Sequence, residues 1–339
     1  MINKTRVMIL LIVLLTISAV SVKAGVSAYV FGDYYVMMQS PVESQKDQHG
    51  FWIRRIYLTY DSNISDKIKA RVRFEMHQDG KLAGNSATID PFVKDAYVSY
   101  QFVPLHSITI GIQDSLTFNN IEKFWGYRHL EKTPFDLYKN RSSRDFAFTL
   151  KGNFDKGKKF GYALQFGNNS SNKDEADKYK QVSGQFSINP TGKLTFEFTG
   201  DYVKKSETKS STLFQGFAGY QGGWGRIGLN YGVETLKEDG KENVNFGVFS
   251  GFIVGKISEV IEAVVRYDIT ADPQVNGNDR FLLIEKGYKT SLLMAGIGWN
   301  IHPKFQVLPN IKIVSYKEND NGVKPDSFSQ FNVTFYYVF

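Results

Sequence analysis

Hydrophobic and polar residues alternate along several stretches of the chain. In residues 193–202, one face carries Leu194, Phe196, Phe198, Gly200 and Tyr202, and the other carries Lys193, Thr195, Glu197, Thr199 and Asp201. A period of two is that of a β-strand, whereas a helix would scatter these side chains around its circumference. Residues 67–77 repeat the pattern, so both stretches are predicted to be strands with one face in lipid and one in water.

The same alternation predicts sixteen strands, and the connections between them are alternately short and long. The predicted strands are 26–38, 51–60, 67–77, 92–102, 107–113, 144–154, 160–168, 179–188, 193–202, 211–220, 224–235, 243–253, 259–269, 289–301, 304–316 and 327–339. Short periplasmic turns, long outer loops and an even strand number are typical of transmembrane barrels. The predicted fold class is therefore all-β, a transmembrane antiparallel β-barrel of about sixteen strands.

The two ends of the chain suggest export to an outer membrane. Lys4 and Arg6 precede an apolar run from Val7 to Leu15, and the small residue Ala24 follows. The run is shorter than the roughly 20 residues that a helix needs to cross a bilayer, so we predict a signal peptide at 1–24 and a barrel at 25–339. The final aromatic strand, ending at Phe339, resembles the signal that barrel-assembly machinery reads. Contacts with membrane lipid and lipopolysaccharide are expected.

Composition argues against several other functions. Without Lys4, Arg6 and Lys23, the chain has 38 basic and 34 acidic residues, a mild excess of +4 with no basic run, so no nucleic-acid partner is predicted. There is no Cys, and the five His residues share neither a metal-ligand spacing nor a nucleophile, so we predict no cofactor, metal or catalytic site. A plugged transporter would need an N-terminal plug and more strands.

A barrel of sixteen strands leaves an aqueous channel. The longest connection, 114–143, is unusually apolar for an exposed loop: it holds Phe118, Phe124, Trp125, Tyr127, Phe135, Leu137 and Tyr138. We therefore expect it to fold into the barrel, pack on the wall and narrow the pore. The alternative is an exposed loop that contacts a partner.

Charges on the inward faces set the expected selectivity of such a channel. The candidate pore-lining and anion-binding residues are Arg55, Lys67, Lys69, Arg71, Arg73, Arg128, Arg226, Arg266 and Lys312. Four of them, on strand 67–77, form a column that rises by about 6.5 Å per step. Carboxylates also fall on inward faces: Glu75, Asp95, Asp145, Glu197, Asp201, Glu262 and Asp268. For each basic residue a structural ion pair competes with a role in transport, but the lumen is expected to be net basic and to prefer anions.

Four segments resemble the phosphate-selective porin O/P family: Phe51 to Leu58, Lys67 to Glu75, Val93 to Val98 and Ile108 to Gln113. The resemblance implies a homotrimer of sixteen-stranded barrels that passes small anions, phosphate among them, along a basic ladder and past an inward-folded third loop. It implies Arg71 and Arg73 as ladder residues with Arg55 nearby, and Arg128 on the loop. Residues 122–136 match no phosphate-site pattern. A non-conducting structural or adhesin-type barrel is the alternative.

Overall fold

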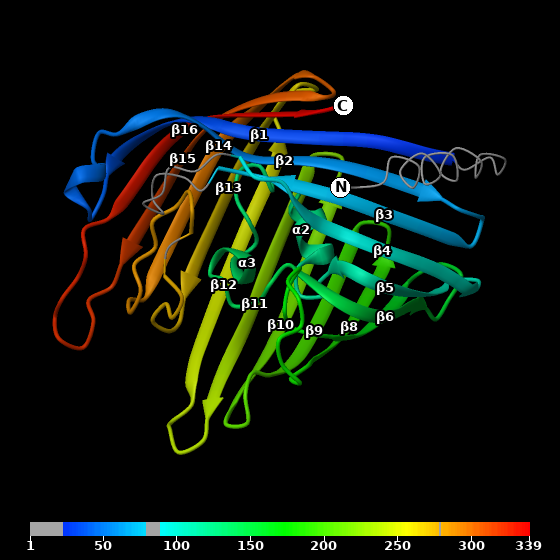
Figure 1. Ribbon diagram of the computed structural model, residues 1–339. Coiled ribbons are helices and arrows are strands. Elements are labelled where there is room, and N and C mark those ends of the chain that lie inside the picture. The colour runs from blue at the N-terminus through cyan, green and yellow to red at the C-terminus, as the bar shows by residue number, and fades with distance from the viewer. Residues whose placement is uncertain (1–22, 79–88, 278) are drawn as a thin grey trace, which may run out of the picture.

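The computed structural model describes residues 23–78, 89–277 and 279–339, so most of the predicted signal peptide lies outside the described residues. Sixteen strands follow one another around the molecule (Figure 1). They are β1 (Lys23–Gln39), β2 (His49–Asn63), β3 (Ile68–Met76), β4 (Phe92–Val103), β5 (His106–Asp114), β6 (Arg144–Asn153), β7 (Phe160–Gly167), β8 (Gln181–Thr191), β9 (Leu194–Lys204), β10 (Lys209–Gly222), β11 (Gly225–Glu238), β12 (Val244–Lys256), β13 (Ile261–Thr270), β14 (Thr290–His302), β15 (Phe305–Tyr316) and β16 (Phe328–Val338).

Each strand pairs antiparallel with its neighbours in sequence, and β16 returns to pair with β1. In that closing pair, Tyr29 lies opposite Val338 and Val36 lies opposite Phe331. Closure leaves no strand with an unpaired edge, which is how a sheet satisfies its backbone groups inside a bilayer. The predicted sixteen-stranded antiparallel barrel is confirmed.

The barrel has two different ends. At one end, here called the turn end, the connections are short, as at 104–105 between β4 and β5 and at 223–224 between β10 and β11. The opposite, or loop, end carries the long connections, including 115–143 and 271–289. The start of β1 and the end of β16 both lie at the turn end, as the alternation of connections predicts. In the described parts of the chain, no helix is both long and apolar enough to cross a membrane.

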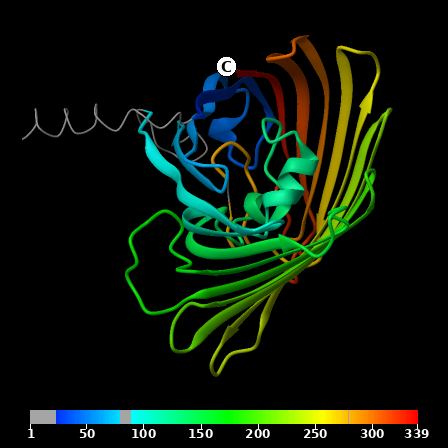
Figure 2. The same ribbon diagram turned by 90° about the vertical axis from the view of Figure 1, so that its right-hand side faces the viewer.

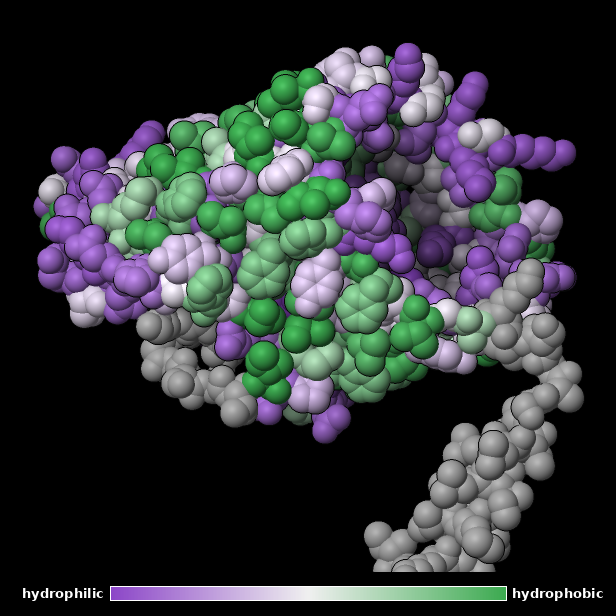
Figure 3. All heavy atoms as spheres, turned by 90° about the horizontal axis from the view of Figure 1, so that it is seen from above, coloured by the Kyte–Doolittle hydropathy of each residue, from purple (hydrophilic) through white to green (hydrophobic). Residues whose placement is uncertain are grey.

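The outer face of the barrel is apolar. Large side chains that alternate outward stay exposed, including Ile110, Leu164, Phe198, Phe214 and Trp299. Figure 3 shows such hydrophobic side chains gathered over the middle of one face, with hydrophilic side chains at both ends. A continuous apolar belt between two polar rims is the surface that a membrane-spanning barrel presents to lipid.

A β-bulge in β2 changes which side chains face inward. Gly32 pairs with Ile53 and Phe31 pairs with Arg55, so Arg54 has no partner on β1. As a result Arg54 and Arg55 are both buried on the inner side, whereas strict alternation would place Arg54 in lipid. The bulge depends on Gly32, because a Cβ at that position would lie 2.3 Å from the carbonyl oxygen of Trp52.

Candidate pore and its charged lining

The connection between β5 and β6 lies inside the ring of strands (Figure 2). It contains the short helices α2 (Asn119–Trp125) and α3 (Pro134–Leu137). Trp125, Phe135, Leu137 and Tyr138 are buried in an apolar core that they share with inward side chains of β10 and of β12 to β16. The ring of Trp125, for example, meets Phe252 of β12 edge-on at 4.8 Å. This packing fills one side of the barrel.

Polar contacts anchor the same segment to the wall. Arg141 bonds to Asp201 of β9 at 2.6 Å and also to Glu234 of β11. Further contacts join Glu131 to Lys312 at 2.7 Å, the Tyr127 hydroxyl to Glu262 at 2.7 Å, and the His129 ring to Gln306 at 2.7 Å. Because these bonds reach several strands, they fix the segment at defined positions along the wall.

Burial and neighbouring charges shift the pKa values of two side chains in this segment, His129 and Glu131. Burial lowers the pKa of His129 to about 3, and the guanidinium groups of Arg54, Arg226 and Arg128 also lower it. Burial alone would raise the pKa of Glu131, but Lys312 and Arg54 hold it below its usual range. At neutral pH His129 is therefore neutral and Glu131 is ionised.

A second connection, 271–289, also enters the barrel. Phe281 to Ile284 are almost fully buried, and Phe281 meets the ring of Trp52 edge-on at 5.0 Å. Asp279 accepts a 2.7 Å bond from Lys132 of the first inserted segment. The alternation of strands marks this connection only as a long loop, so sequence reasoning missed the insertion. The apolar run Phe-Leu-Leu-Ile at 281–284 is the signal that would have indicated it.

The open space lies on the other side, along β2 to β9. A cavity of about 510 Å³ at the turn end is lined by strands β3 to β8 and by α2. A smaller space of about 180 Å³ continues it inward and shares Lys69, Ser99, Asn119 and Lys151 with it. Near the loop end is a third cavity of about 570 Å³, whose lining includes Arg55, Glu75, Lys94 and Asp279. Figure 3 shows a hollow with a hydrophilic rim at the end where β1 begins.

Near the middle of the open side, the arginines are paired with carboxylates. Arg71 forms bonds of 2.7 and 2.9 Å to Asp61, and Arg73 approaches Asp95 at 3.3 Å. On the inserted segment Arg128 pairs with Glu122 at 3.2 Å. Arg144, which sequence reasoning did not single out, bridges Asp95 and Asp114. The basic column on β3 is therefore largely neutralised where it carries arginine.

Three more predicted residues serve the packing of the inserted segments. Arg226 donates to the carbonyl of Trp125 at 2.9 Å. Arg266 is 1% exposed and pairs with Asp268 at 2.6 Å, and Lys312 is 2% exposed and pairs with Glu131. The assignment of Arg266 and Lys312 to the pore surface is therefore wrong, because the inserted segment covers both. Arg55 pairs with Glu75 at 2.9 Å and borders the loop-end cavity.

The predicted lysines are placed differently. Lys67 and Lys69 line the turn-end cavity, together with Lys151 of β6 and Lys123 of α2. Across the described parts of the chain, none of these four ammonium groups forms an ion pair. Asp114, which pairs with Arg144, and Glu197 oppose Lys123 and Lys151 only at longer range, so the four lysines give the open side of the barrel a net positive field. The described parts of the chain also contain no group of three or more His, Asp or Glu side chains that could hold a metal ion.

The fold is similar to that of porins and other outer-membrane proteins. The anion-selective porin from Comamonas acidovorans aligns with a TM-score of 0.70 and 10% identity over 94% of this chain and all of that chain. Outer-membrane expressed OmpT of Vibrio cholerae aligns with a TM-score of 0.66 and 11% identity, covering 95% of this chain and 99% of that one. OmpF of Salmonella typhi, in complex with daunomycin, aligns with a TM-score of 0.66 and 10% identity over 93% and 97%. The sequence matches no family model and no curated protein. These similarities concern the fold.

Proposed function

We propose that the protein is an outer-membrane porin, a water-filled channel for the passive diffusion of small hydrophilic solutes with a preference for anions. One observation carries the proposal: Lys67, Lys69, Lys123 and Lys151 line the open side of the barrel, and none of them forms an ion pair with a described carboxylate. A pore wall with excess fixed positive charge concentrates anions and repels cations. Arginines held in ion pairs add little to that field.

The similar fold of an anion-selective porin supports this reading. The apolar outer face supports a place in a bilayer, and the polar inner face supports a wet lumen. Phosphate is one candidate solute, as the resemblance to the phosphate-selective family implies. With Arg71 and Arg73 paired, we assign the selectivity to the lysines instead.

The cellular setting is part of the proposal. We place the turn end in the periplasm and the loop end outside, in contact with lipopolysaccharide. The carboxyl-terminal Phe339, 66% exposed, pairs its backbone with Ala28 and is proposed as the contact for barrel-assembly machinery. A homotrimer is proposed as well, since the similar OmpT has been described in a trimer form.

The test is the reversal potential across a salt gradient in a planar bilayer, for the native protein and for K69Q/K151Q. The native channel is expected to favour chloride over potassium, and the variant is expected to lose most of that preference while still conducting. K156Q/K193Q, which removes two exposed lysines from the turns, is the matched control and should behave as the native protein. A cation-selective native channel would overturn the assignment of the lysines. Absence of conductance would favour the structural or adhesin-type barrel.

A further inference from the structure

Most of the side chains that line the turn-end cavity are cationic or uncharged and polar. Five lysines line it, namely Lys67, Lys69, Lys123, Lys151 and Lys158, and Asp66 is the one carboxylate among the described lining residues. The other polar members are His106 and a set of hydroxyl or amide groups, including Ser99, Ser107, Ser187, Gln101, Asn119 and Asn153. Such a wall offers many hydrogen bonds and a positive charge that Asp66 offsets only in part.

Two of the lysines stand on either side of a row of hydroxyl groups. Lys69 of β3 lies opposite Ser99 of β4, and Lys151 of β6 lies opposite Ser107 of β5. The Thr109 hydroxyl donates to Ser99 at 3.0 Å, which ties the two middle strands together. Three strand spacings, about 14 Å across the sheet, and an offset of two residues, about 7 Å along the strands, separate the lysine backbones. The two ammonium groups can therefore approach one solute from opposite sides.

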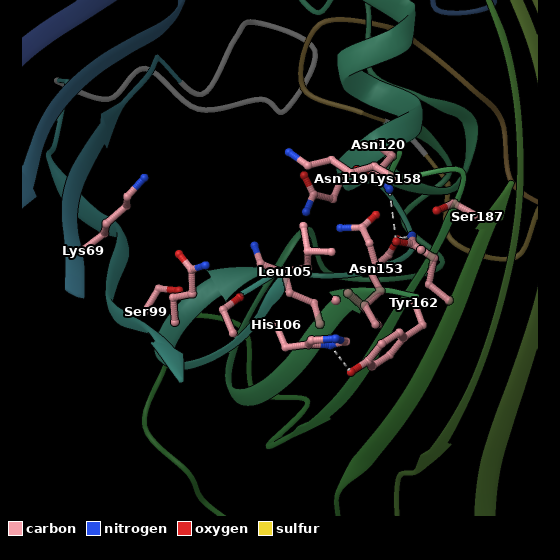
Figure 4. Close-up of a pocket in the computed structure, with 18 of the residues that line it drawn as sticks. Lys69, Ser99, Leu105, His106, Asn119, Asn120, Asn153, Lys158, Tyr162 and Ser187 are labelled. Atoms are coloured by element: carbon pink, nitrogen blue, oxygen red, sulfur yellow. Dashed lines mark hydrogen bonds between the residues drawn. The ribbon is translucent and has the colours of Figure 1, made fainter. Parts of the chain in front are cut away.

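Helix α2 closes this space from the barrel interior. Figure 4 shows Asn119 and Asn120 on α2 beside the cavity, with Lys69 reaching toward it from β3. Asn120 is held in place by bonds to Gln185 at 3.1 Å and to Glu197 at 2.6 Å. The buried Oδ1 atom of Asn119 has no hydrogen-bond partner among the residues that the structure describes. A buried amide oxygen without a partner is costly unless a donor from outside the chain reaches it.

We infer that this cavity is a binding site for a hydroxylated organic anion with at least two negative charges, of the size of a sugar phosphate. Several neighbouring ammonium groups repel one another, and a multivalent anion relieves more of that repulsion than chloride does. A volume of about 510 Å³ exceeds what inorganic phosphate needs and lies in the range of small-molecule sites. The hydroxyl and amide groups suit a polyol, whose hydroxyls donate to side-chain oxygens of the wall, that of Asn119 among them.

The inference rests on the proposed function, because the solute would reach the site through the same open side of the barrel. It predicts a saturable site on the diffusion path rather than a featureless pore. A solute held at such a site partly blocks the chloride current while it is bound, so binding can be measured as a concentration-dependent drop in conductance.

The experiment is titration of the single-channel current in potassium chloride with three probes: glucose 6-phosphate, inorganic phosphate and glucose. Glucose 6-phosphate is expected to block saturably, at concentrations at least tenfold below any effect of glucose and several-fold below that of inorganic phosphate. K69Q/K151Q should weaken the block at least tenfold while still conducting, which shows that the barrel is folded. N119A should weaken the block by glucose 6-phosphate more than that by phosphate. K156Q/K193Q should leave all three titrations unchanged.

The outcomes separate this inference from the proposed function. An anion-selective channel that glucose 6-phosphate does not block would overturn the inference and leave the porin intact. Equal block by inorganic phosphate and glucose 6-phosphate would show that the hydroxyl groups of the sugar do not contribute to binding, which overturns the inferred preference for a hydroxylated anion. Loss of block in K156Q/K193Q would show that general surface charge, and not this cavity, is responsible. No current at all would instead refute the proposed function.

Discussion

Removal of Arg141 is expected to release the first inserted segment from the wall. This residue lies just before β6 and is 7% exposed. Its guanidinium bonds to Asp201 on β9, Glu234 on β11 and Ser211 on β10. No other residue of 115–143 is hydrogen-bonded to three wall strands in the described structure, so Arg141 holds the end of the segment against the filled side.

The size of the effect follows from what Arg141→Met leaves behind. Both carboxylates stay buried. Glu234 keeps hydrogen bonds from Asn140 at 2.7 Å and Ser211 at 2.6 Å, with the Lys205 ammonium at 3.9 Å, whereas Asp201 keeps only the Thr117 hydroxyl at 3.4 Å among the described side chains. Breaking a buried ion pair by removing one partner costs about 3–5 kcal/mol. Since about 1.4 kcal/mol corresponds to a factor of ten, the ratio of folded to unfolded protein should fall by at least about a hundredfold.

The assay is urea unfolding of the barrel in lipid vesicles, followed by the fluorescence of its tryptophans, one of which, Trp125, belongs to the segment. The triple variant Arg141→Met, Asp201→Asn, Glu234→Gln also removes the two carboxylate charges that Arg141→Met leaves without their arginine, and it should recover most of the lost stability. Single-channel records of Arg141→Met should show a noisier current, because the segment moves in the lumen. A single variant whose free energy of unfolding stays within about 0.5 kcal/mol of the native value would refute this account.

Three further changes test the other assignments. Arg266→Gln should leave the reversal potential unchanged but lower the free energy of unfolding by about 3–5 kcal/mol, since the residue is buried and paired with Asp268 rather than placed on the pore surface; a shifted reversal potential would contradict this. Gly111→Ala should abolish folding in detergent, measured by the gel shift between folded and unfolded barrel, because φ is +124° and a Cβ would lie 2.2 Å from the carbonyl oxygen of Ala96. The pKa of His129 is lowered by burial to about 3, from 6.5, so the unfolded chain takes up the proton first as pH falls. Native stability should therefore be full above pH 6.5 and decline toward pH 3, and His129→Gln should flatten that decline in urea titrations at each pH.

Much of the fold could be read from local sequence because a barrel wall imposes the same rule on every strand. In β9, each residue from Leu194 to Tyr202 faces either the lipid or the inner side of the barrel, and the polarity of its side chain indicates which face it is on. The same rule fails at Arg54, where a bulge adds one residue and turns two neighbouring arginines inward. The alternation within β2 cannot reveal this bulge, because the bulge depends on how β2 pairs with β1 and on the space that Gly32 leaves.

The sequence by itself determined the strand number, the antiparallel order, the two unlike ends and the apolar outer face, since these follow from side-chain periodicity and connection length. Only the tertiary structure decided which basic residues remain free. Arg71 and Arg73 meet Asp61 and Asp95, which come from the neighbouring strands β2 and β4, while Arg266 disappears beneath an inserted segment more than a hundred residues away in sequence. Periodicity assigns a charge to a face, but its partner is set by register between strands and by the path of long connections. Neither can be read from one strand alone.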